Sequence, residues 1–167
     1  MPVTIRLAVN GDASDMAEIG ARSWEAAYKN ILPECYIREK NARRLEQFTY
    51  SITDKNEDAY VIQKNGKTIG IMKIAATADD DLTRDYFELH YIYLHPDHFR
   101  RGIGTEAMDF AFKKAREAGK KFISVWVFAE NINSIRFYEK CGFVPDGKFK
   151  LQDRGGPVKV IRMKRKL

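Results

Sequence analysis

A short basic and glycine-containing stretch, RRGIGT at positions 100–105, stands between an apolar run and a helical pattern. The first N–H groups of a helix lack intrahelical partners, and the helix macrodipole adds partial positive charge there. Glycines let a bulky ligand approach the backbone, and arginines donate charged hydrogen bonds to phosphate oxygens. The stretch therefore predicts an anion site that suits a pyrophosphate. The alternative is a surface turn whose arginines are solvated.

The same glycines also fit a dinucleotide fingerprint. GIGTEA at positions 102–107 matches Gly-x-Gly-x-x-Ala, and Glu130 follows the next apolar run. A doubly wound sheet needs further strand–helix units after such an acidic residue, but fewer than 40 residues follow Glu130. The residues before position 90 also lack the regular strand–helix alternation of that fold. The position of the motif in the chain argues against a dinucleotide site.

The elements that must position the turn lie on both sides of it. Residues 86–94 are β-branched and aromatic and predict a strand, which Pro96 ends because proline gives no N–H to a ladder. Apolar residues recur at helical spacing over 103–118, and Gly119 is typical of a helix C-terminus. The nearly continuous apolar run 121–128 predicts a strand buried on both faces.

The C-terminal part of the chain predicts a helix and a pair of strands. Asn131 or Asn133 is expected to cap the helix, and Gly142 closes it. Residues 143–150 and 158–166 then predict antiparallel strands. Apolar residues interrupt the basic end of the chain, which favours a charged edge strand over a nucleic-acid-binding tail.

The N-terminal part predicts a strand and two helices. Residues 4–8 alternate as a strand does, and Asp12 or Ser14 is expected to cap a helix that runs to about Tyr28. One further helix is expected after Pro33. It would carry Tyr36, Ile37, Leu45 and Phe48.

Residues 59–63 and 68–74 predict a hairpin, because they flank the turn dipeptide Asn65-Gly66. The acidic run 79–81 that follows is expected to be a solvated loop tip. Three adjacent aspartates without spacing are a poor ligand set, so no metal site is predicted there.

The composition indicates one globular domain over residues 1–167. The net charge of +6 suits an acidic partner such as a nucleotide cofactor, while no nucleic-acid recognition motif is present. Two cysteines make neither a metal cluster nor a disulfide framework. No apolar run is long enough to span a membrane, and no signal peptide begins the chain, so a cytoplasmic protein is expected.

The order of these elements resembles the GNAT superfamily of acetyl-CoA-dependent N-acetyltransferases. A strand, Pro-Asp, Arg-Arg-Gly-Ile-Gly, an amphipathic helix, a strand and then NINSIRFYEKCGF (131–143) carry the resemblance, which is strongest from Glu88 to Phe143. The chain departs from the family pattern at Phe99, where a polar residue is usual, and Arg100 is a substitute. The resemblance implies an α/β fold with a mixed, mostly antiparallel, twisted sheet flanked by helices.

The resemblance also implies where acetyl-CoA binds. The pantetheine arm would lie where strand 86–94 and strand 121–128 splay apart, with an N–H near Leu94 polarising the thioester carbonyl. Asn131 would bind the same arm, with Asn133 as second choice. The cofactor-binding residues expected on these grounds are Ile92, Tyr93, Leu94, Arg100, Arg101, Gly102, Ile103, Gly104, Thr105, Asn131 and Asn133.

Two catalytic residues follow from the same resemblance. Tyr138 stands where the family has its usual tyrosine acid, and a phenol is protonated at neutral pH; the alternative is a core tyrosine at helical spacing. Glu88 matches the family's strand glutamate and would take the ammonium proton through water; the alternative is a glutamate that faces solvent. His90 lies two residues on, on the same face of an undistorted strand, and is the reserve base.

The acceptor of the acetyl group is expected to be a primary amine. Trp24 and Tyr28, and also Tyr36, are candidates to line its site, although aromatic residues at helical spacing are more often core. The sequence does not separate a polyamine, a small amine, a protein N-terminus or a lysine, and it leaves a homodimer open. The rival interpretation is a non-catalytic acyl-CoA-binding or regulatory module on the same fold.

Overall fold

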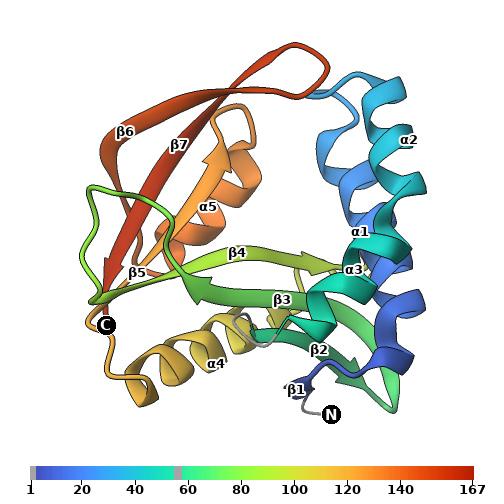
Figure 1. The fold of residues 1–167 in the computed structure, drawn as a ribbon, viewed down its shortest axis with the longest axis horizontal. Coiled ribbons are helices and arrows are strands. Elements are labelled where there is room, and N and C mark those ends of the chain that lie inside the picture. Colours follow the sequence, from blue (N-terminus) through green and yellow to red (C-terminus); the bar gives the residue numbers. More distant parts are fainter. Residues whose placement is uncertain (1–2, 55–57) are drawn as a thin grey trace.

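One seven-stranded sheet runs through the computed structural model, which describes residues 3–54 and 58–167 (Figure 1). Its strand order is β1-β2-β3-β4-β5-β7-β6, and every neighbouring pair is antiparallel except β4 and β5. The predicted mixed, mostly antiparallel sheet with flanking helices is confirmed. The strands are β1 (Thr4–Leu7), β2 (Asp58–Lys64), β3 (Lys67–Ala76), β4 (Tyr86–Leu94), β5 (Phe122–Phe128), β6 (Val144–Asp153) and β7 (Pro157–Lys166). The helices are α1 (Ala13–Tyr28), α2 (Glu34–Ala42), α3 (Arg44–Thr53), α4 (Ile103–Glu117) and α5 (Ile132–Lys140), with short 3₁₀ turns at Asn10–Asp12 and Pro96–His98.

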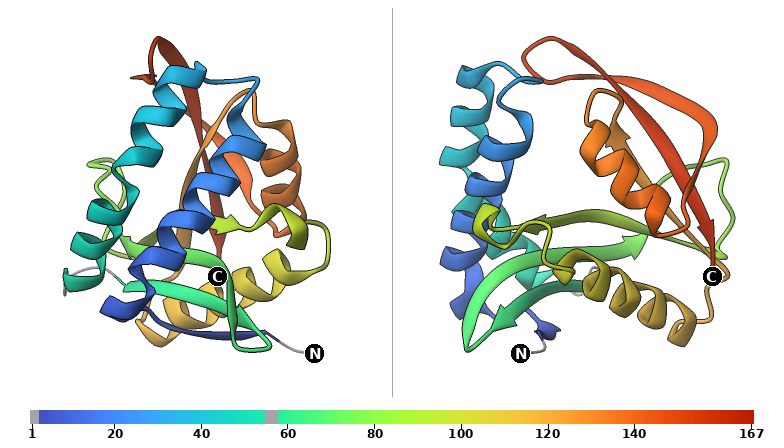
Figure 2. Two further views of the ribbon diagram at one scale, coloured as in Figure 1. Left: turned by 90° about the vertical axis from the view of Figure 1, so that its right-hand side faces the viewer. Right: turned by 180° about the vertical axis from the view of Figure 1, so that it is seen from behind.

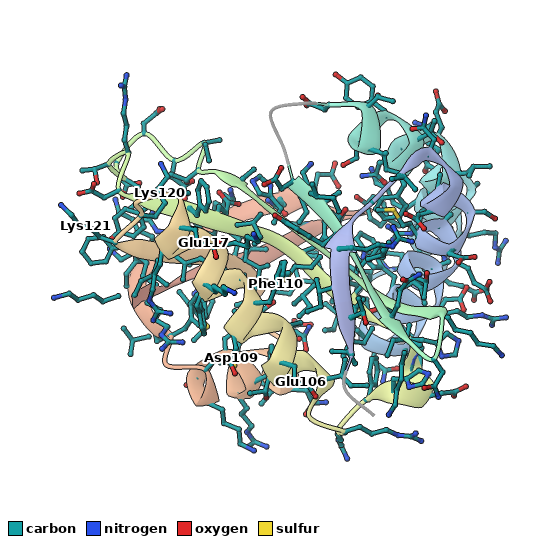
Figure 3. The ribbon with its side chains drawn as sticks, turned by 90° about the horizontal axis from the view of Figure 1, so that it is seen from below. Glu106, Asp109, Phe110, Glu117, Lys120 and Lys121 are labelled. Atoms are coloured by element: carbon teal, nitrogen blue, oxygen red, sulfur yellow. The ribbon has the colours of Figure 1, made fainter. Side chains whose placement is uncertain are left out.

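Helices cover both faces of the sheet (Figure 2). Met72, Ile74 and Leu89 pack toward α4, whose buried residues are spaced three or four apart and form one apolar stripe. The acidic residues of α4 lie on its outer side, as Figure 3 shows. On the opposite face, Val61 and Ile71 pack against α1 and α3. Strands β2 and β3, which lie between these layers, are therefore buried on both sides. Strand β5, which the sequence predicts to be buried on both faces, has five of its seven residues buried.

Turn residues adopt the conformations that their types favour. Asn65 and Gly66 both have positive φ, 52° and 76°, which fits the primed turn of the predicted hairpin. Gly119 has φ 73° directly after α4, as a helix C-terminus often requires. Asp12 precedes α1, but its carboxylate caps no helical N–H. It accepts hydrogen bonds from Arg6 (2.7 and 2.9 Å) and from the Val9 N–H (2.8 Å).

The prediction of one helix after Pro33 is wrong, because α2 and α3 are separate helices. The chain leaves helical geometry at Arg43, where φ is −101° and ψ is 0°. The break allows α3 to lie close against α1 at Gly20. A Cβ atom at Gly20 would lie 3.1 Å from both Arg44 and Phe48, so the mid-helix glycine is explained by this helix contact.

Two predictions about charged segments, the acidic run 79–81 and the basic C-terminal strand, are also wrong. The acidic run is not a solvated tip, since Asp79 and Asp81 both bind the buried guanidinium of Arg162 at 2.7–3.2 Å. The basic strand β7 is not an edge strand either, because it lies between β5 and β6. Both errors have one cause: the last strand inserts into the sheet and brings its arginine to a loop about 80 residues earlier, as the separation of 81 positions shows.

Candidate active site

The sheet opens between its two parallel strands. Pairing of β4 with β5 ends at Leu89 and Val125, although β4 continues to Leu94 and β5 to Phe128. Over its whole length β5 stays paired with β7, so the two strands diverge toward their C-terminal ends (Figure 1). Along residues 90–94 the edge of β4 that faces β5 pairs with no strand of the described residues. The splay that the family resemblance implies here is present.

A β-bulge distorts β4 at this point. Leu89 pairs with Ile74 and Tyr91 pairs with Lys73, so His90 is an extra residue between two consecutive partners. Beyond the bulge the side-chain alternation is reversed, and Glu88 shares its face with Tyr91 and Tyr93. The prediction that Glu88 and His90 share a face of an undistorted strand is therefore wrong, because the strand is distorted at His90. The two groups are nevertheless neighbours, with 4.0 Å between the Glu88 Oε1 and His90 Nδ1 atoms.

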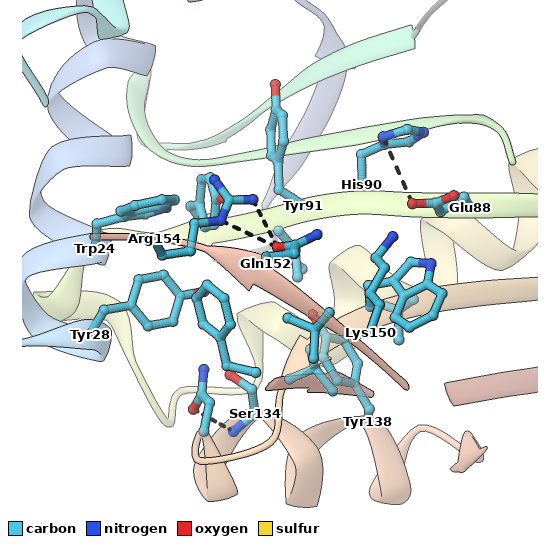
Figure 4. A pocket seen from close by; sticks show the side chains of 18 residues that line it. Trp24, Tyr28, Glu88, His90, Tyr91, Ser134, Tyr138, Lys150, Gln152 and Arg154 are labelled. Atoms are coloured by element: carbon cyan, nitrogen blue, oxygen red, sulfur yellow. Dashed lines mark hydrogen bonds and ion pairs between the residues drawn. The ribbon is translucent and has the colours of Figure 1, made fainter. Parts of the chain in front are cut away.

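A cavity of about 310 Å³ lies in the splay (Figure 4). Among the residues predicted for the site, those that line it are Trp24, Tyr28, Glu88, His90, Ile92, Tyr93, Asn131 and Tyr138. Leu94, Tyr36, Asn133 and the glycine turn do not line it. The structure thus brings the two catalytic candidates and two acceptor-wall candidates to one cavity.

Tyr138 enters the cavity from α5 and is only 7% exposed. Its ring contacts Phe143 at 5.6 Å between centroids, so it belongs to the apolar core and to the cavity wall at once. Burial, with smaller effects from Tyr93 and Cys141, raises the pKa of its phenol well above the ordinary value. The hydroxyl therefore carries its proton at neutral pH, as a general acid must.

Glu88 and His90 lie on the other side of the cavity, on β4, as Figure 4 shows. The Glu88 side chain is 12% exposed and that of His90 is 29% exposed. Both can therefore reach solvent or a bound water, which suits a base that works through water better than a sealed core position would.

The glycine turn has the geometry of a helix N-terminus. Gly102 has φ 79° and Arg100 has φ 59°, so the chain makes a left-handed turn directly before α4. The first amides of α4 have no intrahelical acceptor. Gly104 also has a packing role. A Cβ atom there would lie 3.1 Å from the Phe137 ring, so this glycine permits the contact between α4 and α5.

Of the two asparagine candidates, Asn131 is the cap of α5. It is buried, and its Oδ1 accepts a hydrogen bond of 3.2 Å from the Ser134 N–H. Asn133 is exposed and lies outside the cavity. The side chain of Phe99, where the family usually has a polar residue, is exposed at the start of the turn.

The sequence reasoning missed the part of the wall that comes from the hairpin of β6 and β7. Lys150, Gln152 and Arg154 all line the cavity. The hairpin tip packs on the start of α2, since a Cβ atom at Gly155 would lie 3.1 Å from the Tyr36 side chain. The basic and glycine-rich composition of the tip was visible, but no local pattern tells where a hairpin tip packs.

The aromatic residues of α1 form the end of the cavity under this hairpin. Trp24 and Tyr28 meet edge to face at 5.1 Å, and Tyr28 meets Phe128 of β5 at 4.9 Å. The guanidinium of Arg44 lies over the Trp24 ring, 4.4 Å from its centroid. Burial is the main cause that raises the pKa of Tyr28 and of Tyr93. The aromatic residues are thus both core and wall.

Solved structures share this fold over the full chain. The PaiA N-acetyltransferase of Thermoplasma acidophilum, solved in complex with coenzyme A, superposes with a TM-score of 0.79 at 22% identity, covering 100% of both chains. The resemblance at that identity is one of fold. No helix in residues 3–54 or 58–167 is long and apolar enough to cross a membrane.

Two relatives in sequence are also named N-acetyltransferases. An uncharacterized N-acetyltransferase of Methanocaldococcus jannaschii is 29% identical over 141 residues, which are 84% of this chain and 60% of that protein. The uncharacterized N-acetyltransferase YuaI of Bacillus subtilis is 28% identical over 138 residues, 82% of this chain and 78% of that protein. The profile of the acetyltransferase (GNAT) family matches residues 23–143, well over half of the chain. The protein therefore belongs to the acetyltransferase (GNAT) family, whose co-substrate is acetyl-CoA.

Proposed function

We propose that the protein transfers the acetyl group of acetyl-CoA to a primary amine by direct attack in a ternary complex. One observation carries the proposal: Tyr138 and Glu88, from different elements, line a single cavity at the splay of the sheet. A buried phenol that keeps its proton and a partly exposed carboxylate are the acid and the base that amide formation from a thioester needs.

The residues around the splay suit acetyl-CoA. On the β5 side, the backbone groups of β4 at Ile92–Leu94 have no strand partner in the part of the chain that the structure describes, and they would pair with the pantetheine amides. The stretch from Arg100 to Thr105 would hold the pyrophosphate on helix amides and guanidinium groups. Asn131 would contact the pantetheine arm through its amide nitrogen, because its oxygen is bound to Ser134. When bound, the co-substrate supplies an activated acetyl group on sulfur.

The protein's own residues then manage two protons. Glu88, through water, takes the proton from the substrate ammonium so that the nitrogen lone pair can form the new bond to the acetyl carbon. Tyr138 donates its hydroxyl proton to the sulfur as the carbon–sulfur bond breaks. An N–H of the β4 edge near Leu94 would polarise the carbonyl oxygen during the step.

Turnover with a panel of amines tests the proposal. Release of the CoA thiol that depends on an added amine, with the N-acetyl product identified by mass, is the expected result. Acetyl-CoA binding without amine-dependent release from any amine would support the non-catalytic module instead. A cytoplasmic location, a single domain over residues 1–167 and a homodimer stay predictions.

A further inference from the structure

The cavity carries more positive than negative charge. The basic side chains of Arg154 and Lys150 line it, and Glu88 is the single carboxylate among the described residues that line it. Within residues 3–54 and 58–167, neither cation forms an ion pair: Lys150 lies over the Trp126 ring at 4.0 Å, and Arg154 bonds neutral groups. Another basic side chain of the same hairpin does form an ion pair: Lys148 Nζ lies 3.7 Å from Asp81 Oδ2.

Hydrogen bonds fix the Arg154 side chain and leave two of its N–H groups unused by the described residues. Its Nε and Nη2 atoms donate to the Gln152 Oε1 at 3.2 and 3.0 Å, and Nη1 donates to the Tyr36 hydroxyl at 3.1 Å. These contacts use three of the five N–H groups of a guanidinium and leave one on each terminal nitrogen. A fixed guanidinium with two remaining donors is suited to bind a carboxylate.

A second unpaired guanidinium lies behind the same end of the cavity. Arg44 is 3% exposed, and its Nε donates to the Asn41 Oδ1 at 2.9 Å. Its Nη2 has no hydrogen-bond partner among the described residues. Burial lowers the pKa of Arg44 itself. Burial also raises the pKa of Tyr28 and of Tyr93, and the charges of Arg44 and Arg154 offset part of that rise. Neither Arg44 nor Arg154 forms an ion pair with a carboxylate among the described residues, so both charges act on the end of the cavity at Tyr28 and Tyr93.

The opposite charge lies at the other side of the cavity. Figure 4 shows Arg154 beside Trp24 and Tyr28, and Glu88 beyond Lys150 on the far side. A ligand that matches this arrangement carries an anionic group toward α1 and a cationic group toward β4. A diamine or a polyamine would instead bring a second ammonium to the guanidinium end, where like charges repel.

We propose that the acceptor is an amine that also bears a carboxylate, and that Arg154 binds this carboxylate while the amine lies toward Glu88. The inference rests on the proposed transfer reaction and narrows its acceptor to amino acids and peptides with a nearby carboxylate. Lys150 adds attraction at the cavity mouth, and Arg44 adds it from behind Trp24 and Tyr28.

Three matched series of acceptors test this specificity. The first contains amino acids whose amine and carboxylate are separated by one to six carbons. The second contains alkylamines of the same lengths, and the third contains diamines in which an ammonium replaces the carboxylate. We expect the best amino acid to exceed its alkylamine in kcat/KM by at least about tenfold, since a hydrogen bond to a charged group contributes on that scale. Diamines as the best acceptors would overturn the proposal.

The variant Arg154→Gln removes the charge and keeps a similar shape. We expect the ratio of kcat/KM between amino acid and alkylamine to fall at least about tenfold, mainly through KM, and Arg154→Lys to retain part of it. Arg116→Gln, the same change at an exposed position of α4, should leave the ratio unaltered. An unchanged ratio in Arg154→Gln, with a thermal transition like that of the wild type, would refute the assignment.

Failure of the transfer reaction can be separated from failure of the carboxylate site. If no amine of any series is acetylated, the proposed function fails for small amines, and binding is measured directly with the protein and CoA. Hexanoate should then bind the wild type at least about tenfold more tightly than it binds Arg154→Gln, and hexylammonium should not compete with it. Equal binding of hexanoate by both proteins, or preference for hexylammonium, would refute the proposal that Arg154 binds a carboxylate.

Discussion

Replacing Arg162 by methionine should destabilise the protein more than a surface change would. The guanidinium is buried and bonds three carboxylates, at 2.7 Å to both oxygens of Asp81, 2.8 Å to Asp146 and 3.2 Å to Asp79. Methionine has a similar length but no donors. The variant would therefore leave three carboxylates close together without their shared cation, and two of them are mostly buried.

The expected loss in the free energy of unfolding is about 3 kcal/mol at neutral pH, the lower end of the range for removing one partner of a buried pair. The lower end applies because the Asp81 side chain is 45% exposed and can be rehydrated, and because Lys164 remains 3.3 Å from Asp146. With a urea m-value of about 2 kcal/mol/M, the midpoint should fall by roughly 1.5 M.

The pH dependence of this difference gives an independent check. Burial acts to raise the pKa of Asp146, but hydrogen bonds from the Lys148 N–H, Arg162 and Lys164 outweigh burial, so this pKa lies below its usual value. Hydrogen bonds from Arg162 likewise lower the pKa of Asp81. Groups with a lowered folded pKa stabilise above their unfolded value, about 3.9, and lose that stabilisation as pH falls through the folded pKa. The gap between wild type and variant should therefore be full at pH 7 and shrink below about pH 4.

Urea titrations from pH 3 to pH 7 would measure both quantities, with Arg116→Met as the matched control. Arg116 is exposed on α4, and its side chain makes no ion pair with a described residue. We expect the control to change stability by less than about 0.5 kcal/mol. A loss below about 1 kcal/mol in Arg162→Met, or a gap that stays constant with pH, would refute the account of this network as an electrostatic clamp.

Three further predictions concern the proposed transfer reaction. Tyr138→Phe should keep its fold and its acetyl-CoA affinity but lose turnover by roughly 10²–10⁴-fold, measured as amine-dependent CoA release; full activity would exclude the phenol as the acid. Glu88→Gln should lose turnover on the same scale, with partial rescue at higher pH, where more of the amine is already neutral. If Glu88→Gln keeps full activity, His90 is the next candidate to test. Phe99→Arg should change the calorimetric CoA affinity by less than about tenfold, about 1.4 kcal/mol, because Phe99 is exposed and the helix amides remain; a much larger gain would identify the chain as a weakened CoA binder.

Local patterns were enough to predict most elements of the fold. The Asn65-Gly66 hairpin, the apolar stripe of α4 and the doubly buried β5 follow from turn chemistry and periodicity, which act over a few residues. The catalytic candidates on β4 and α5 came instead from a resemblance that extends over a longer stretch. Their convergence on one cavity follows from the topology, since β5 connects the two elements.

Most of the errors and omissions involve contacts between distant parts of the chain; the bulge at His90 and the local pairing of Asp12 with Arg6 are the exceptions. The break at Arg43 allows α3 to pack against Gly20, and the roles of Asp79 and Asp81 depend on Arg162, 83 and 81 positions later. Arg154 reaches the cavity because the hairpin tip packs on Tyr36, 118 positions earlier. A charged residue in a turn carries no local sign of such a partner, so its role cannot be read from its neighbours.

The bulge at His90 accounts for several features of the site together. Pairing between β4 and β5 ends at Leu89, directly before the extra residue, and a bulge bends its strand and increases its twist. Because β7 holds β5 along its whole length, β4 turns away from β5 at that point. The bend leaves the following backbone edge of β4 open for a ligand, and the reversed alternation directs Tyr91 and Tyr93 to the face of Glu88. One inserted residue therefore both opens the cleft in which we propose that acetyl-CoA binds and places Tyr91 and Tyr93 on the face of Glu88, the proposed base.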